Sequence, residues 1–289
     1  MYKISTLVYQ LAGLAAGPEY GPLLREFLRK PQDHGEAILG LTRCDVGLTA
    51  SILRCCNAVN SYYGTESVGT LEEAEVRLGL DPIVEVITKL ATKEVYQLPR
   101  EAEIHLAELW DHCLLTGVLT RRLADHCPDP AELAFTAGLL HDIGKLFIIK
   151  IAPRMYSQTL AAAAQGHKTC AAQEQEDFEN NHARIGAEVL ERWKLPRNLV
   201  QAISRHHHPQ LNATQYPLAG CIALADTLAH HSLEQSAPNL NLCLDKNASL
   251  LQELGLDATE LATVLQEGQA QFTEIKRQVT SSLPQPLSE

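Results

Sequence analysis

Apolar residues recur along the chain at three- and four-residue spacing, in segments separated by short turns. Leu133, Ala134, Ala137 and Leu140 form one such run, and this spacing places them on one face of a helix. Strands would require alternation of apolar and polar residues between turn signals, and no segment shows this convincingly. The hydrophobic pattern therefore predicts an all-α, multi-helix protein.

Helix-start signals precede several of these runs. Thr70 and Glu73 have the spacing of a capping box, in which each side chain binds a backbone amide of the other residue. Proline suits the first turn of a helix because it lacks the amide hydrogen that would be unpaired there. We therefore expect further helices to open at Asp81-Pro82, Asp129-Pro130 and Leu195-Pro196.

A proline followed by an acidic stretch at Gln97–Arg100 marks a boundary. We expect residues 1–97 to form a helical N-terminal lobe and residues 98–279 to form a second helical domain. The second domain holds almost every histidine that could carry chemistry. Residues 280–289 contain two prolines and are predicted to be a loose C-terminal tail.

Composition narrows the functional classes. Hydrophobic residues make up 45 % of the chain and charged residues 20 %, as in ordinary globular proteins. The formal net charge of −11 disfavours broad contact with a phosphate backbone, so we expect no nucleic-acid partner. The sequence lacks an uncharged apolar stretch long enough to span a bilayer, and its eight cysteines form no C-x-x-C pair. We therefore expect a cytoplasmic protein with reduced thiols and no membrane partner.

The segment His141-Asp142-Ile143-Gly144-Lys145 is the central chemical signal. Adjacent helical residues point about 100° apart, so His141 and Asp142 can face one ion only where the helix ends. We expect Gly144 to supply that break. Lys145 would then lie near the site as a point charge suited to a phosphate. A histidine and an aspartate that merely cap a helix end are the structural alternative.

Further imidazoles and carboxylates favour a metal site over simple capping. Glu108 and His112 are four residues apart, which places them on one face of a helix. Asp226 interrupts an otherwise apolar helix, where a lone carboxylate is costly to bury. Such N and O donors suit Fe, Mn or Zn, and a shared aspartate can bridge two ions. The predicted ligands are Glu108, His112, His141, Asp142, His182, His206, His207 and Asp226.

In the order of these residues the chain resembles the HD superfamily of metal-dependent phosphohydrolases, and more specifically the HDOD (HD-related output domain) family. The segments that carry this resemblance are Asp45 to Arg54 with Asn57, Thr70 to Gly79, Trp110 to His112, Gly138 to Lys145, His182 to Gly186, Trp193 with Pro196, and His206-His207 before Pro209. The resemblance implies an all-helical HD-type fold and a role in bacterial signal transduction.

Many HDOD proteins have lost metal ligands, whereas this chain resembles the HD-GYP phosphodiesterases in retaining the whole set. It lacks their Gly-Tyr-Pro stretch, since Tyr216-Pro217 has no preceding glycine. Two hypotheses follow. In the first, about two divalent Fe, Mn or Zn ions, with Asp142 and Lys145 as catalytic residues, hydrolyse a phosphoester or cyclic (di)nucleotide. In the second, the metal site of a non-catalytic signalling module is structural or senses a ligand. The expected partner is an upstream signalling protein or a small phosphorylated or nucleotide ligand.

Overall fold

The structure is a computed structural model that describes residues 14, 16–17, 20–91, 100–166, 168–208, 214–234, 244–245 and 247–281. Helices joined by short turns make up this part of the chain, and it contains no strand. The prediction of an all-α fold is therefore confirmed. Among the described helices, none combines the length and the apolar character needed to span a membrane.

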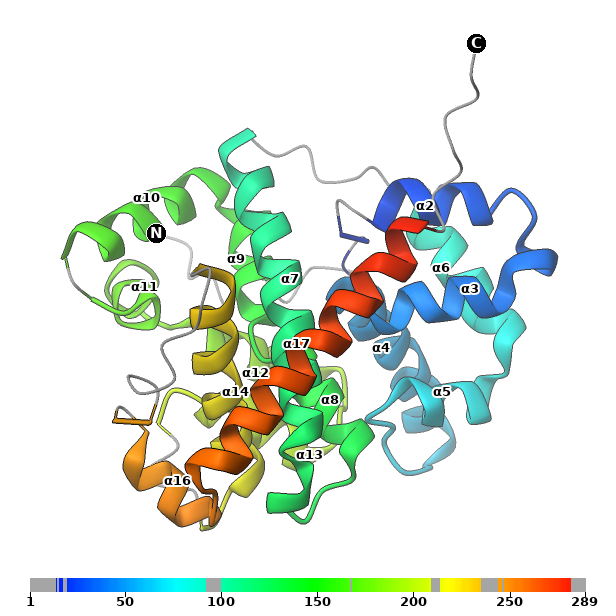
Figure 1. The fold of residues 1–289 in the computed structure, drawn as a ribbon. Helices are drawn as coiled ribbons and strands as arrows, with labels where there is room; N and C mark the ends of the chain where they lie inside the picture. The colour runs from blue at the N-terminus through cyan, green and yellow to red at the C-terminus, as the bar shows by residue number, and fades with distance from the viewer. Residues whose placement is uncertain are drawn as a thin grey trace.

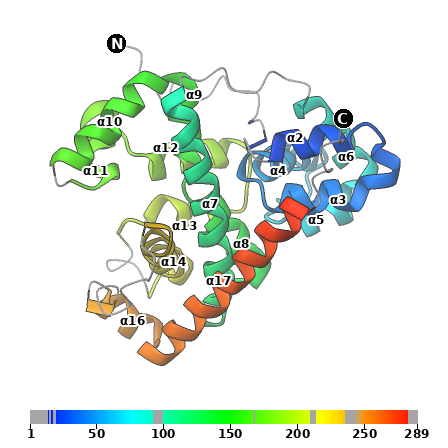
Figure 2. The same cartoon turned by 45° about the horizontal axis from the view of Figure 1, so that its top comes forward.

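The N-terminal lobe lies on one side of the long helix α7 (Figures 1 and 2). Its described helices are α2 (Tyr20–Phe27), α3 (Pro31–Arg43), α4 (Val46–Tyr63), α5 (Leu71–Leu78) and α6 (Leu80–Ala91). Residues 92–99 lie outside the described residues, so the domain boundary at residue 98 stays a prediction. One buried core connects this lobe to the rest of the molecule, since it includes Leu53 of α4 and Leu114 of α7.

The second group of helices is built around α7 (Arg100–Arg122). This helix packs against α8 (Ala131–Leu140), α14 (Pro217–Glu234) and α17 (Ala258–Ser281). The remaining described elements are the 3-10 turn η1 (Ala124–His126), α9 (Ile143–Ile151), α10 (Pro153–Gly166), α11 (Cys170–Phe178), α12 (His182–Arg192), α13 (Arg197–Arg205) and α16 (Ala248–Leu254).

Helix α17 crosses α7 and reaches toward the N-terminal lobe (Figure 1). Its first half buries Leu261 and Leu265 in a second core cluster with α14 and α16. Its second half packs Phe272 and Ile275 against the main core. The helix continues to Ser281, one residue beyond the predicted start of the loose tail at residue 280, and residues 282–289 lie outside the described part.

The predicted helix starts agree with the structure to within two residues. The Thr70 hydroxyl accepts a hydrogen bond from the Glu73 backbone amide. The Glu73 carboxylate accepts one from the Thr70 backbone amide, so the capping box is confirmed. Helix α6 begins at Leu80, which places Asp81 inside its first turn. Pro130 and Pro196 are N-caps rather than first helical residues, because ψ of 145° and 139° leaves both in extended backbone.

The helix break at the central motif occurs at Asp142, not at Gly144 as predicted. His141 keeps helical angles as the C-cap of α8, whereas Asp142 leaves the helix with φ −99° and ψ 12°. Gly144 lies inside α9, and a Cβ atom there would be 1.9 Å from the carbonyl oxygen of His182. This glycine therefore allows close contact between α9 and α12 instead of ending a helix.

Candidate metal centre

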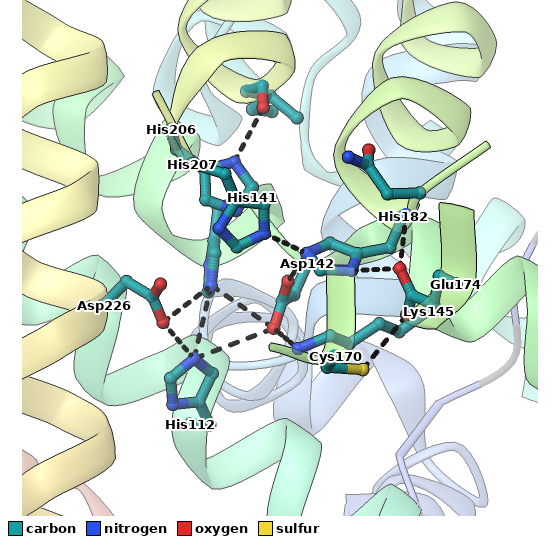
Figure 3. Close-up of polar contacts among 12 residues, drawn as sticks. His112, His141, Asp142, Lys145, Cys170, Glu174, His182, His206, His207 and Asp226 are labelled. Carbon is teal, nitrogen blue, oxygen red and sulfur yellow. Dashed lines mark hydrogen bonds and ion pairs between the residues drawn. The ribbon is translucent and has the colours of Figure 1, made fainter. Parts of the chain in front are cut away.

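Seven of the eight predicted ligands come together at one centre (Figure 3). Their donor atoms form overlapping groups of three within 4.8 Å of one another. Most of them lie at helix ends, where neighbouring side chains can diverge from the helical spacing. The seven are His112 on α7, His141 and Asp142 between α8 and α9, His182 at the start of α12, His206 and His207 after α13, and Asp226 on α14.

Glu108 is the predicted ligand that the structure does not bring to this centre. Its side chain is exposed, and none of the metal-competent groups in the described residues includes it. The four-residue spacing with His112 is real, but α7 buries only the His112 end of that face against α14. A ligand role for Glu108 stays a prediction.

One half of the centre gathers around Asp226. Nε2 of His112 lies 3.0 Å from Oδ1 of Asp226 and 3.3 Å from Nε2 of His141. Oδ2 of Asp142 lies 3.7 Å from His112 and 3.4 Å from His141. Two imidazole nitrogens and two carboxylates therefore face one small volume, which is a donor set suited to a transition metal.

The other half gathers around His182. Its Nε2 atom lies 2.9 Å from Oδ1 of Asp142 and 2.7 Å from Nε2 of His207. His206 completes this group, with its ring 4.0 Å from that of His207. Asp142 thus presents Oδ2 to the first half and Oδ1 to the second, which is the position of a bridging carboxylate.

The histidine rings are held with their Nε2 atoms toward the centre. Nδ1 of His141 lies 2.7 Å from the Gly138 carbonyl, and Nδ1 of His206 lies 2.7 Å from the Ile203 carbonyl. Because a carbonyl only accepts, each Nδ1 carries the proton, and the lone pair of a neutral ring is on Nε2. Nε2 of His206 is buried without a hydrogen-bond partner.

Asp142 has an equally unusual environment. Its Oδ1 atom is buried and accepts no hydrogen bond, although Nε2 of His182 is 2.9 Å away. Lone pairs that converge in this way without a hydrogen-bond partner are costly to bury unless a positive charge lies between them. The residues therefore fit one or two divalent ions, and the chemistry of the donors alone does not name the metal.

The electrostatics of the first half favour positive charge. Burial would lower the pKa of His141, but the Asp142 charge and hydrogen bonds to Asp142 and Asp226 outweigh it and raise the pKa to about 10. Burial also opposes ionisation of Asp142, yet His141, Lys145 and His182 hold its pKa well below its usual range. Burial opposes ionisation of Asp226 too, but His112 and His141 hold its pKa well below its usual range. Both carboxylates consequently stay ionised and attract a cation.

The pKa values of His206 and His207 are lowered, in contrast to that of His141. Burial, aided by the nearby charges of His141 and His182, lowers the pKa of His206 to about 3. Burial and the neighbouring rings of His206 and His182 also hold the pKa of His207 well below its usual range. Both rings are therefore neutral near pH 7, which is the form that binds metal.

Lys145 extends from the first turn of α9 to the carboxylate of Asp142. Its Nζ atom lies 2.5 Å from Oδ2 of Asp142, and its side chain is 20 % exposed. The structure therefore places this cation at the edge of the centre, as predicted. The contact that it makes in the described residues is with Asp142, and its contact with a phosphate stays a prediction.

Glu174 is a functional candidate that the sequence reasoning missed. Its side chain is fully buried and its Oε2 atom lies 2.6 Å from Nδ1 of His182. Glu174 belongs to the polar run of α11, which has the composition of a solvated helix. The available signal was its helical spacing with the buried apolar residues Ala171 and Phe178, which places a carboxylate on the inward face.

Comparison with known proteins gives the family. The HDOD domain matches residues 18–209, which is more than half of the chain. The chain belongs to the HDOD family. The matched range contains every candidate ligand except Asp226, and Pro209 at its end lies outside the residues that the structure describes.

Solved structures share the fold. The MmoQ response regulator of Methylococcus capsulatus superposes with a TM-score of 0.72 at 24 % identity, over 88 % of this chain and 98 % of that one. An HDOD domain protein of unknown function from Geobacter sulfurreducens has a TM-score of 0.53 at 20 % identity, covering 97 % of both chains.

Among curated sequences, a ribonuclease Y of Opitutus terrae is 27 % identical over 205 residues, which are 68 % of this HDOD chain and 31 % of the ribonuclease. Other curated matches range from 25 % to 39 % of the relative's own length. The HDOD chain thus spans well under half of the curated relatives that it matches.

Proposed function

We propose that this HDOD protein binds two divalent transition-metal ions at the centre and hydrolyses a phosphoester. The observation that carries the proposal is the convergence of seven imidazole and carboxylate side chains whose buried atoms include the unpaired Nε2 of His206 and Oδ1 of Asp142. A structural cap would pair these atoms within the protein, whereas a metal site leaves them free.

Two groups of ligands support two ions. His112, His141 and Asp226 would hold one, and His182, His206 and His207 the other, with Asp142 shared between them. A pair of bound divalent ions supplies Lewis acidity, which lowers the pKa of water and neutralises charge on a phosphoryl group. Fe, Mn and Zn suit this mixture of imidazole and carboxylate donors.

The chain itself would position the substrate. Lys145 can turn from Asp142 toward a phosphoryl oxygen, because its side chain is partly exposed at the edge of the centre. His112 and Asp226, which are 3.0 Å apart, are also partly exposed, with 13 % and 25 % of their side chains accessible. The buried residues His141 and His182 orient Asp142 from either side.

The substrate we favour is a small phosphoester or cyclic nucleotide. The net charge of −11 opposes binding along a polyanion. The similarity to ribonuclease Y adds an RNA phosphodiester to the linkages worth testing. The missing Gly-Tyr-Pro stretch argues against cyclic di-GMP as the default choice.

Metal content tests the proposal. We would purify the protein without chelators or a metal-binding tag and compare it with His141→Ala/Asp142→Ala. A matched control is Asp33→Ala/His34→Ala, which removes an adjacent aspartate and histidine from α3. We expect about two ions per chain in the wild type and the control, and none in the first variant.

Turnover is then measured on bis(p-nitrophenyl) phosphate, cyclic dinucleotides and a short RNA. Hydrolysis that depends on His141 and Asp142 supports the enzyme. Absence of metal after reconstitution with Fe, Mn and Zn would overturn the whole proposal.

A non-catalytic signalling module is the second candidate. It is favoured by the fold shared with the MmoQ response regulator and by the pairing of Lys145 with Asp142. In this case the protein binds metal but hydrolyses none of the substrates. The His141→Ala/Asp142→Ala variant then loses stability or affinity for a signalling partner, with no turnover to lose.

A further inference from the structure

Glu174 contacts the metal centre through one of its predicted ligands. Its Oε2 atom accepts from the backbone amide of His182 at 2.7 Å and lies 2.6 Å from the Nδ1 atom of the same ring. Figure 3 shows the carboxylate on the side of His182 that faces away from Asp142. The two nitrogens of this ring thus face two different carboxylates.

The second oxygen of Glu174 is also fully engaged. Oε1 accepts from the hydroxyl of Tyr156 at 3.1 Å and from the thiol of Cys170 at 3.3 Å. Tyr156 lies on α10 and Cys170 opens α11, so the packing of these two helices fixes the carboxylate. Four donors hold Glu174 in place, and its side chain is completely buried.

We propose that Glu174 is a positioning residue that keeps the proton of His182 on Nδ1 and so directs the lone pair of Nε2 toward Asp142 and His207. This inference rests on the proposed metal-binding function and deepens it. A carboxylate behind a metal-binding imidazole fixes the tautomer and the ring orientation, and it makes the ring a better donor. The described Nδ1 contacts of His141 and His206 are with backbone carbonyls, whereas that of His182 is with a carboxylate.

Cys170, Glu174 and His182 also lie close enough to hold an ion themselves. The hydrogen bonds argue against this use. An ion bound there would displace the Nδ1 proton of His182, which already has a short bond to Glu174. It would also displace the thiol donor of Cys170. Glu174 therefore acts through His182 and not as a ligand.

The test compares Glu174→Gln with Asp177→Asn. Both are acid-to-amide changes on α11, and Asp177 binds Thr159 of α10 without touching His182. The dissociation constant for Zn²⁺ is measured by competition with a chromogenic chelator. We expect Glu174→Gln to weaken one of the two ions roughly 10- to 100-fold and Asp177→Asn to leave both unchanged.

A second measurement uses metal-free protein. Nitrogen-15 NMR of labelled histidine reports which ring nitrogen carries the proton, with His182→Gln as the assignment control. The wild type should keep the His182 proton on Nδ1, and Glu174→Gln should lose that preference. This readout needs neither bound metal nor hydrolysis, so it decides the role of Glu174 even if the proposed function fails.

Two further variants keep the inference open to refutation if Glu174→Gln does not fold. Tyr156→Phe removes one donor to Oε1, and we expect a several-fold loss of Zn²⁺ affinity. Cys170→Ser should keep the number of bound ions. An unchanged tautomer and affinity in Glu174→Gln or, if that variant is unfolded, unchanged affinity in Tyr156→Phe would overturn the inference. The inference would also be overturned if Cys170→Ser loses an ion and the Co²⁺-loaded wild type shows a thiolate absorption band, because Cys170 would then be a metal ligand.

Discussion

Gly144 lies where the chain has no room for a side chain. A Cβ atom at this position would be 1.9 Å from the carbonyl oxygen of His182 and 2.8 Å from its Cα atom. These are backbone atoms of α12, so they cannot rotate away as a flexible side chain could. The contact also joins Gly144, two residues after the Asp142 break, to the first residue of α12, and thus sets the separation of the predicted ligands Asp142 and His182.

Gly144→Ala should therefore destabilise the protein. Overpacking of a well-packed site costs about 1–3 kcal/mol, and contact with backbone puts this case at the upper end. The free energy of unfolding is measured with urea. Gly166→Ala is the control, because Gly166 ends α10 with no atom within 4 Å of its added Cβ. Equal stability of the two variants would contradict the close approach of α9 and α12.

Asp45 is a buried carboxylate that connects three parts of the chain. It caps α4 through the Leu48 amide, accepts from the Gly17 amide, and accepts from the indole of Trp110 on α7. Burial raises its pKa to about 6, although these hydrogen bonds oppose the rise. Trp110 lies two residues before His112, so this carboxylate joins the N-terminal lobe to a helix of the metal centre.

The raised pKa of Asp45 predicts the direction in which stability changes with pH. Between pH 3.8 and about 6 the folded protein keeps the Asp45 proton while the unfolded chain has released it. Stability contributed by this group is therefore highest near pH 4 and falls as the pH rises through about 6. Asp45→Asn lacks this dependence, so its stability deficit should shrink by about 2 kcal/mol between pH 4 and pH 7.

Urea unfolding of both proteins across this pH range provides the measurement. The difference between the two proteins matters, because other titrating groups are common to both. A deficit that is constant with pH, or that grows toward pH 7, would contradict the raised pKa of Asp45.

At the scale of helices, the sequence was most informative where a local rule acts alone. The capping box at Thr70 needs only residues three apart, and the structure has it. The proline signals located α8 and α13 to about one residue. The prediction that Gly144 ends a helix is wrong because its role depends on a second helix, and nothing local distinguishes a glycine that ends a helix from one that allows close packing.

At the metal centre, too, some residues could be predicted from local pattern and others only from tertiary packing. Imidazoles and buried carboxylates are rare enough for type and order to predict seven converging residues. Glu108 met the same local criterion as His112, and only the packing of α7 separates them. Glu174 lay in a run of polar residues, and its inward position follows from how α11 packs on α10 and α12. Local pattern thus predicts which residue types can bind, and tertiary packing selects among them.

For the molecule as a whole, the centre joins helices that are distant in sequence. Its side chains come from α7, the α8–α9 junction, α12, the end of α13, and α14, over residues 112 to 226. Buried atoms without a hydrogen-bond partner lie there, including Oδ1 of Asp142 and Nε2 of His206. Bound ions would therefore both remove the cost of burying these atoms and hold these helices together through shared ligands.

Metal loading should consequently stabilise the whole fold. Ligands that bind only the native state add about 2.7 kcal/mol to the free energy of unfolding at a free concentration 100 times Kd. We expect this gain with Zn²⁺ or Mn²⁺ in the wild type and in Asp33→Ala/His34→Ala, and its loss in His141→Ala/Asp142→Ala. Mg²⁺ at the same concentration should add much less, because it prefers an all-oxygen shell. Denaturant unfolding with and without each ion decides the matter. Equal stabilisation of the wild type and the His141→Ala/Asp142→Ala variant would show that the ions act elsewhere on the protein.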